Sequence, residues 1–340
     1  MEIRNRSRKL ITFVDVKFRP GHIAVRCALS AVPVIFVWNK ACSGVSINVS
    51  FMMDSHTPPV SPAPVPAGPL RRPFPGIGDL FAMLGIVFGV QVVAGIVLTA
   101  VLSLLGWELG RLDPARQGFF TALAYVSSML PAYLLVLWYR HMRGGSGPIG
   151  RFAVRGLNPV LLAWAFLLML AAGVVCEPLL TWLPAPADLD YGRGVWAFAT
   201  LVVAAPVLEE LLCRGLVLGA LRSRFGVVAA WLLSSLFFGV LHLQPMLVVN
   251  AFVIGLILGY IYLVTDSLWA SMVLHALNNA IAYLMLATGR GDLLLSDLIG
   301  SRTLYWSIYI GAVVVMLLSG WMVRRTLRRL KEQAENPVFE

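Results

Sequence analysis

The sequence predicts an all-α, polytopic membrane protein with about eight transmembrane helices. Of its 340 residues, 59% are hydrophobic and 13% are charged, and the mean hydropathy is +0.80. Seventeen acidic residues are too few to cover the surface of a soluble globular protein of this length. The apolar residues also occur in long runs instead of amphipathic stripes. These observations exclude a soluble fold, a disordered chain and a disulfide scaffold, since the four cysteines are scattered.

Eight apolar segments follow one another along the chain after residue 78. Each is close to the ~20 residues that cross a bilayer as a helix. In lipid, only helices and closed barrels satisfy their own backbone hydrogen bonds, so we expect one helix per segment. The predicted spans are 80–105, 118–139, 159–176, 195–221, 227–243, 246–264, 268–287 and 304–323.

The chain before the first predicted span has a different composition. Residues 1–53 contain a weak apolar stretch that Arg26 interrupts, so they do not form a regular signal peptide. We treat them as an uncertain N-terminal extension, for which a mis-assigned start codon is one explanation. Residues 54–78 include TPPVSPAPVPAGP and predict an extended Pro-rich linker. The membrane domain is expected over 79–323, and a basic cytoplasmic tail over 324–340.

Arginines mark one side of the predicted membrane domain. They lie in alternate loops and in the tail, whereas the opposite loops hold mostly aspartate and glutamate. By the positive-inside rule the arginine-rich side is cytoplasmic, and an even number of spans puts both termini there. The net charge of +10 then reflects topology, and we expect a lipid bilayer and no nucleic acid as partner. Because the basic residues are mostly arginine, we expect the inner (plasma) membrane of a bacterium with a GC-rich genome.

Charged side chains in the predicted span 195–221 are the first candidates for a functional role. Glu209, Glu210 and Arg214 lie in otherwise apolar surroundings, although a charge at the bilayer centre costs about 3 kcal/mol even on a mild scale. Glu210 and Arg214 are four residues apart and can pair on one helix face. Glu209 faces about 100° away and is then left free, although, five residues before Arg214, it is the alternative partner of that arginine. The alternative is a purely structural salt bridge.

Two further predicted spans each contain a histidine with a partner one helical turn away. These pairs are Phe238 with His242 and His275 with Asn279. A carboxylate, two imidazoles and an amide can hold and deprotonate a water and stabilise an oxyanion. Glu209, His242 and His275 could instead be the three protein ligands of a catalytic zinc ion. Interhelical hydrogen bonding alone is a third explanation.

The predicted depths of the two histidines differ. At ~1.5 Å per residue, His242 lies ~24 Å from the inner end of its span and His275 only ~10 Å. If they share a site, we expect tilted or shortened helices, or a later start of the span 227–243.

Three short motifs in this region resemble those of a known family. EELLCR (209–214), FGVLH (238–242) and HALNN (275–279) are similar to the EExxxR, FxxxH and HxxxN motifs of the CPBP intramembrane proteases, the CAAX-protease and bacteriocin-processing or Abi family. The similar core covers about 195–285. Each motif is weak alone, but three in order, each in its own predicted span, form a specific pattern.

The resemblance implies catalytic roles for four residues. Glu209 would be the general base and would hold the nucleophilic water together with His242. His275 and Asn279 would stabilise the oxyanion of the tetrahedral intermediate. The implied mechanism uses a glutamate-activated water without metal or another cofactor. Zinc held by Glu209, His242 and His275 is the alternative.

The resemblance also implies three supporting residues, Glu210, Arg214 and Phe238. Glu210 and Arg214 would fix their helix and adjust the reactivity of Glu209. Phe238 is the first residue of the second motif.

The predicted function is therefore that of an intramembrane endopeptidase, a hydrolase that acts on a peptide or membrane-protein substrate. A proton-coupled transporter, with the carboxylates and histidines as a relay, is one alternative. Transporters are commonly built from internal repeats, and we find no second copy of the motifs. A catalytically silent membrane scaffold of the same family is the other alternative, and the intact motif residues favour an active enzyme over it.

Overall fold

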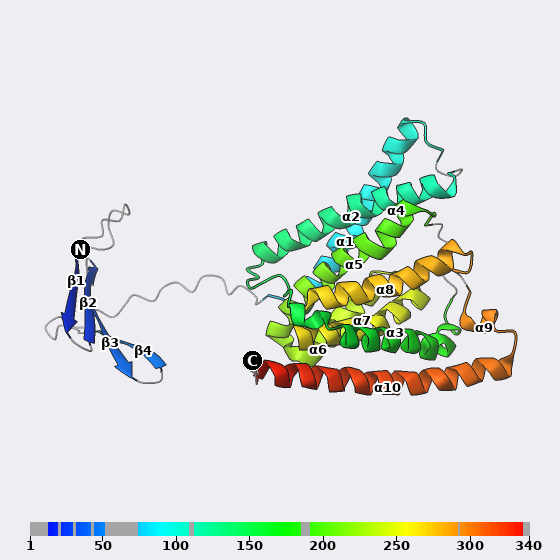
Figure 1. Ribbon diagram of the computed structural model, residues 1–340. Helices are drawn as coiled ribbons and strands as arrows, with labels where there is room; N and C mark the ends of the chain where they lie inside the picture. The colour runs from blue at the N-terminus through cyan, green and yellow to red at the C-terminus, as the bar shows by residue number, and fades with distance from the viewer. Residues whose placement is uncertain are drawn as a thin grey trace. The chain divides into compact units, whose positions relative to one another are not determined.

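The computed structural model divides the chain into two units, Met1–Leu70 and Arg71–Glu340 (Figure 1). In the first unit, the structure describes the backbone of four strands. In the second, it describes residues 74–108, 112–184, 191–291 and 293–335. The predicted Pro-rich linker falls outside the described residues up to residue 73, as does the predicted tail after residue 335.

The strands of the first unit form one antiparallel sheet in the order β1-β2-β3-β4. Val16 is opposite Val25, Val25 is opposite Phe36, and Phe36 is opposite Val49, so one row of strand-forming apolar residues crosses the sheet. The sequence alone predicts no secondary structure for this segment. The strand bounds are β1 Phe13–Arg19, β2 His22–Leu29, β3 Val32–Ala41 and β4 Gly44–Phe51.

The second unit is built of helices, which confirms the all-α prediction for the membrane domain. Segments η3 and η4 are π-helical, and η2 is a short 3-10 helix. The bounds are α1 Ile77–Leu104, α2 Pro114–Met142, η2 Val154–Leu157, α3 Pro159–Leu180, α4 Val195–Phe198, η3 Ala199–Ala204, α5 Ala205–Glu210, η4 Leu211–Leu218, α6 Gly219–Val240, α7 Pro245–Thr265, α8 Leu268–Ala287, α9 Leu295–Leu298 and α10 Arg302–Glu335.

Prolines and capping side chains fix where several of these helices begin. Helix α2 starts at Pro114, and the carboxylate of Asp113 accepts hydrogen bonds from the backbone N–H of Ala115 and Arg116, both at 3.0 Å. Helix α3 begins in the same way at a proline after an asparagine cap, and α8 begins after a serine cap. These caps satisfy N–H groups that the first helical turn leaves unpaired.

Six helices in the described part of the chain are long and apolar enough to cross a membrane: α1, α2, α3, α7, α8 and α10. They match six of the eight predicted spans. The predicted spans 195–221 and 227–243 are helical, but neither is a long regular apolar helix. The first is divided by η3 and η4 and carries three charges. The count of eight is therefore approximate.

The chain reverses its direction at Gly226, inside α6. Its φ of 80° and ψ of 176° are not helical, and this backbone region is essentially restricted to glycine. Leu221 before the reversal and Ala230 after it pack in the same core cluster. The two predicted spans thus form an antiparallel pair, which brings the FGVLH motif beside the EELLCR motif.

Three buried clusters among the described residues hold the helices together. The first joins α1, α2, η4, α6 and α7, the second joins α3, α7, α8 and α10, and the third joins η4, α7 and α8. Helix α10 runs along one edge of the unit beside α3 (Figure 1). Helices α1 and α10 leave many large apolar side chains exposed, among them Phe81, Ile96 and Leu317. Such surfaces are expected of helices that face lipid.

Candidate active site

A fully buried ion pair lies at the centre of the candidate site. Arg214 Nη1 donates to Glu210 Oε1 at 2.7 Å, and neither side chain is exposed. Arg214 Nη2 donates to the Gly255 carbonyl on α7 at 2.9 Å. The pairing predicted from the four-residue spacing is thus present, and it also ties η4 to α7. Glycine suits position 255 because a Cβ there would lie 3.1 Å from the Phe238 ring.

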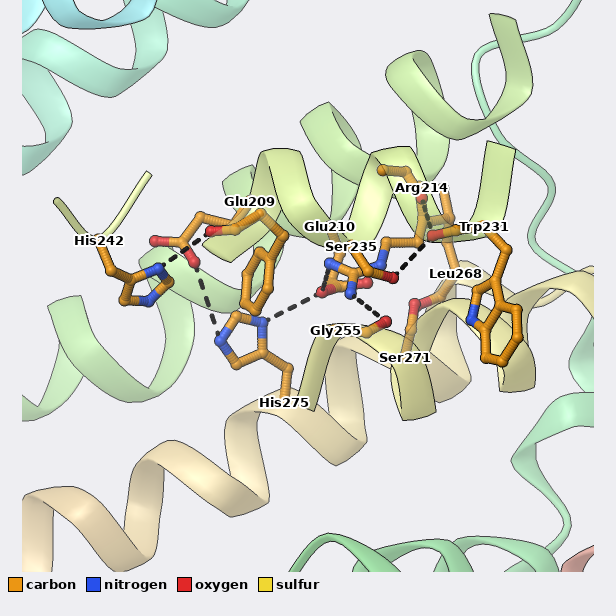
Figure 2. Close-up of polar contacts among 12 residues, drawn as sticks. Glu209, Glu210, Arg214, Trp231, Ser235, His242, Gly255, Leu268, Ser271 and His275 are labelled. Atoms are coloured by element: carbon orange, nitrogen blue, oxygen red, sulfur yellow. Dashed lines mark hydrogen bonds and ion pairs between the residues drawn. The ribbon is translucent and has the colours of Figure 1, made fainter. Parts of the chain in front are cut away.

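His275 lies between the two adjacent glutamates (Figure 2). Its Nδ1 is 3.2 Å from Glu210 Oε1, and its Nε2 is 3.9 Å from Glu209 Oε2. An ionised carboxylate only accepts hydrogen bonds, so the proton belongs on Nδ1 when Glu210 is ionised. The distance of 3.9 Å is too long for a direct hydrogen bond from Nε2 to Glu209.

Phe238 contacts both histidines and the arginine. Its ring centroid lies 5.2 Å from that of His242 and 5.3 Å from that of His275, both in T-shaped geometry. The Arg214 guanidinium stacks over the same ring at 4.5 Å. The phenyl ring thus packs against the buried cation and against both imidazoles, and it fixes the spacing between the two imidazole rings.

His242 lies in the turn that follows α6, where Leu243 has a positive φ of 60°. Its Nδ1 is 3.1 Å from the Phe238 carbonyl oxygen. A carbonyl accepts only, so this contact requires the proton on Nδ1. In the neutral ring, Nε2 is then a free acceptor.

Glu209 is the more accessible of the two carboxylates, with 13% of its side chain exposed. Tyr125 on α2 donates from Oη to Glu209 Oε1 at 3.0 Å. Because Oε1 is bound in this way, Oε2 is the oxygen that faces His275. Figure 2 shows the carboxylate of Glu209 at the same end of the polar network as both imidazoles.

Tyr125 was not predicted from the sequence. It lies 84 residues before Glu209 and belongs to none of the three motifs. A tyrosine within a predicted span is ordinary, so only its position in the fold reveals its contact.

Asn279 lies one turn after His275 on α8, as its spacing predicts. Its Nδ2 donates to the Leu201 carbonyl in η3 at 2.9 Å, and its Oδ1 accepts from Asn278 at 3.5 Å. These contacts place the amide against η3. Of the seven predicted site residues, Asn279 is therefore the one that the described contacts do not join to Glu209, Glu210 or Phe238.

His242 and His275 lie at similar depths because α8 begins deeper in the unit than the sequence predicts. Leu268 is fully buried beside Gly215, and its N–H donates to the Arg151 carbonyl at 2.8 Å. Gly215 lies seven residues, ~10 Å, before Arg222 at the arginine-containing end of its helical run. Helix α8 thus begins ~10 Å deeper in the unit than Arg222. His275, seven residues later, lies ~20 Å deeper than Arg222. This depth is close to the ~24 Å predicted for His242.

The described residues contain no group of three His, Cys, Asp or Glu side chains placed to hold a metal ion. The alternative ligands Glu209, His242 and His275 are therefore not arranged as one set.

Glu177 is a further buried carboxylate, near the C-terminal end of α3. Its two oxygens accept the backbone N–H groups of Leu295 and Ser296 at 2.9 and 2.8 Å. It caps α9 and belongs to no catalytic group described above.

Comparisons with known proteins agree with the motifs. Residues 192–281 match the family described as "Type II CAAX prenyl endopeptidase Rce1-like". The protein of Bacillus subtilis (strain 168) named "Putative membrane peptidase YdiL" is 29% identical over 85 residues, which are 24% of this chain. The match covers 34% of that relative, so the chain spans about a third of its length. No solved structure matches. The family match contains all three motifs and supports the resemblance: residues 192–281 are similar to the CPBP family of membrane proteases.

Proposed function

We propose that this protein is an intramembrane endopeptidase that hydrolyses a peptide bond with a water activated by Glu209. One observation carries the proposal. Of two adjacent carboxylates, Glu210 is fully buried and paired with Arg214, whereas Glu209 is partly exposed and turns one oxygen towards His275. A general base needs such a free carboxylate oxygen within reach of the water that it deprotonates.

The water is held between Glu209 Oε2 and the free Nε2 of His242. Glu209 takes one proton from it as its oxygen attacks the carbonyl carbon of the substrate. The carbon–nitrogen bond then breaks, and the proton on Glu209 passes to the leaving amine. Glu209 returns to its ionised form, so the cycle needs no other reactant.

In this mechanism His275 stabilises the oxyanion of the tetrahedral intermediate. With Nδ1–H bound to Glu210, its Nε2 donates to the oxyanion only when the ring is doubly protonated. Before the attack both glutamates, at 3.2 and 3.9 Å, stabilise that positive charge; once Glu209 has taken the proton of the water, Glu210 and the oxyanion itself do so. Glu210 therefore holds the ring in position and compensates its charge. Asn279 would add a second donor after leaving the Leu201 carbonyl, or would position α8 without touching the substrate.

The substrate is a peptide or a membrane protein that reaches the site from the bilayer. The family description and the name of the Bacillus relative both specify peptide hydrolysis. The arginine-rich loops favour a bacterial inner membrane location with both termini in the cytoplasm.

The proposal is tested by comparing the wild type with Glu209→Gln and a matched control, Glu177→Gln, all purified as full chains. Each is assayed against a library of quenched peptides, with and without a chelator. We expect Glu209→Gln to lower the rate about 100-fold or more, as for loss of a general base, and Glu177→Gln to stay near wild type.

Two other outcomes would change the assignment. Inhibition by the chelator that zinc reverses would transfer the activation of water to a metal. Equal rates for the wild type and Glu209→Gln would contradict the proposal and favour the transporter or the silent scaffold.

A further inference from the structure

A cavity of about 700 Å³ lies outside the candidate active site, between η2, the end of α7 and the C-terminal part of α10. Its described lining divides into two kinds of side chain. One kind is cationic and comprises Arg155, Arg324, Arg328 and Lys331. The other is largely apolar and comprises Tyr260, Val264, Thr265, Leu327 and Leu330.

The cationic wall is formed mainly by α10. Arg324 and Arg328 are four residues apart, so they project from the same face of the helix. Both are exposed, and within the described part of the chain no ion pair neutralises either. Arg155 approaches from η2, but Asp266 lies 3.6 Å from it and partly compensates its charge. The cavity therefore keeps an excess of positive charge from α10.

The apolar wall continues the membrane-facing part of the same helices. Leu327 is buried in the cluster that α10 shares with α3 and α7, and Val264 is 42% exposed at the end of α7. The apolar sequence of α10 ends at Val323, immediately before Arg324. The cavity thus lies where hydrocarbon gives way to phosphate on the arginine-rich side of the membrane.

We propose that this cavity binds the headgroup phosphate of an anionic phospholipid of the cytoplasmic leaflet. Arg324 and Arg328 bind the phosphate oxygens, and the acyl chains extend along Tyr260 and Val264. Basic pockets between membrane helices on this side suit such headgroups. A free phosphate would use only the cationic wall, whereas a phospholipid uses both. The site is independent of the peptidase chemistry.

The helix offers a matched control for this proposal. Arg325 and Arg329 are also exposed, are also four residues apart, and lie on the neighbouring face outside the cavity lining. Arg325 lies instead over the Trp321 ring at 5.2 Å. The double variants Arg324→Ala/Arg328→Ala and Arg325→Ala/Arg329→Ala therefore remove equal charge from the same helix.

The test measures binding of a fluorescent phosphatidylglycerol to the full chain in detergent, with phosphatidylcholine as the neutral probe. We expect Arg324→Ala/Arg328→Ala to weaken phosphatidylglycerol binding by about tenfold or more, since each cation near an anionic headgroup contributes about fivefold. Arg325→Ala/Arg329→Ala should change it less than threefold. Millimolar inorganic phosphate should not displace the lipid, and thermal unfolding should be alike for both variants.

Three results would overturn the proposal. Equal loss in both double variants would mean general attraction between a basic helix and anionic lipid. Binding of phosphatidylcholine as tight as that of phosphatidylglycerol would show that the net charge of the headgroup does not determine binding. Full displacement by inorganic phosphate would identify a soluble anion as the ligand.

Discussion

At the scale of single residues, the site depends on holding each oxygen of Glu209 in a different environment. Tyr125 binds Oε1, and Oε2 faces His275. A carboxylate with one oxygen fixed by a hydrogen bond has fewer orientations, so its free oxygen is better aligned for proton transfer. Tyr125 is a positioning residue in this account, since it acts through Glu209.

The contribution of Tyr125 can be tested by Tyr125→Phe, which keeps the ring and removes the hydroxyl. A hydrogen bond to a charged group contributes about 1.5–3 kcal/mol, so we expect kcat to fall about 10–100-fold with KM little changed. Tyr133→Phe on the same helix is the control and should behave as the wild type. An unchanged kcat for Tyr125→Phe would show that Glu209 needs no such support.

The buried ion pair makes a second prediction at this scale. Arg214→Gln leaves Glu210 as a buried charge without its partner, which costs about 3–5 kcal/mol of stability. The double variant Glu210→Gln/Arg214→Gln removes both charges, so we expect it to be less destabilised than Arg214→Gln alone. Unfolding in mixed detergent measures both. A double variant less stable than the single one would show that the pair stabilises by more than mutual neutralisation.

At the scale of elements, the site depends on the antiparallel pair on either side of Gly226. That reversal brings Phe238 over Arg214 and His242 to the depth of His275. The π-helical segments η3 and η4 flank α5, which carries both glutamates. Interruptions of this kind are frequent at functional sites because they turn side chains out of the regular helical positions.

The reversal predicts different effects for two glycines of α6. A Cβ at Gly226 would meet no atom within 4 Å, so Gly226→Ala tests the backbone conformation alone. We expect a loss of about 1–3 kcal/mol in stability, the cost of this backbone region for a non-glycine residue. Gly219 also has free space, but its φ of −59° is helical. Gly219→Ala should therefore be neutral or stabilising, by up to ~1 kcal/mol. Equal stability of the two variants would contradict a strained reversal at Gly226.

The predicted spans agree with the helices where an apolar run of membrane-spanning length is uninterrupted, as for α3, α7 and α8. The spans 195–221 and 227–243 were located, but their irregular form was not predicted. A π-helical turn has no composition of its own, and the sequence RFGVV at 224–228 does not reveal the φ of Gly226. The recessed start of α8 depends on contacts with Gly150 and Arg151, more than 110 residues earlier in the chain.

At the scale of the whole molecule, the motifs identified the charged and imidazole side chains of the site because such groups are rare within membrane spans. The contacts that these side chains make could be assigned only from the fold. The Gly255 carbonyl that binds Arg214 is a backbone group, and Tyr125 is an ordinary residue for a span, so neither stands out in the sequence. Asn279 was placed correctly one turn after His275, but its bond to Leu201 depends on how η3 packs against α8.

The membrane unit as a whole combines a polar interior with a lipid-facing exterior. The buried pair, the histidines and Glu209 lie among α2, α5, η4, α6 and α8, whereas α10 packs on α3 away from them and lines the cationic cavity. Loss of lipid binding at α10 and loss of peptide cleavage at Glu209 should therefore be separable by mutation.

The central claim is that Glu209 performs chemistry on a bound peptide. The most direct measurement determines, on the same preparation of Glu209→Gln, both the Kd for a cleaved peptide and the single-turnover rate of its cleavage. We predict a Kd within about threefold of wild type and a rate lower by about 100-fold or more. A weakened Kd with an unchanged rate for the bound peptide would contradict the claim and make Glu209 a binding residue.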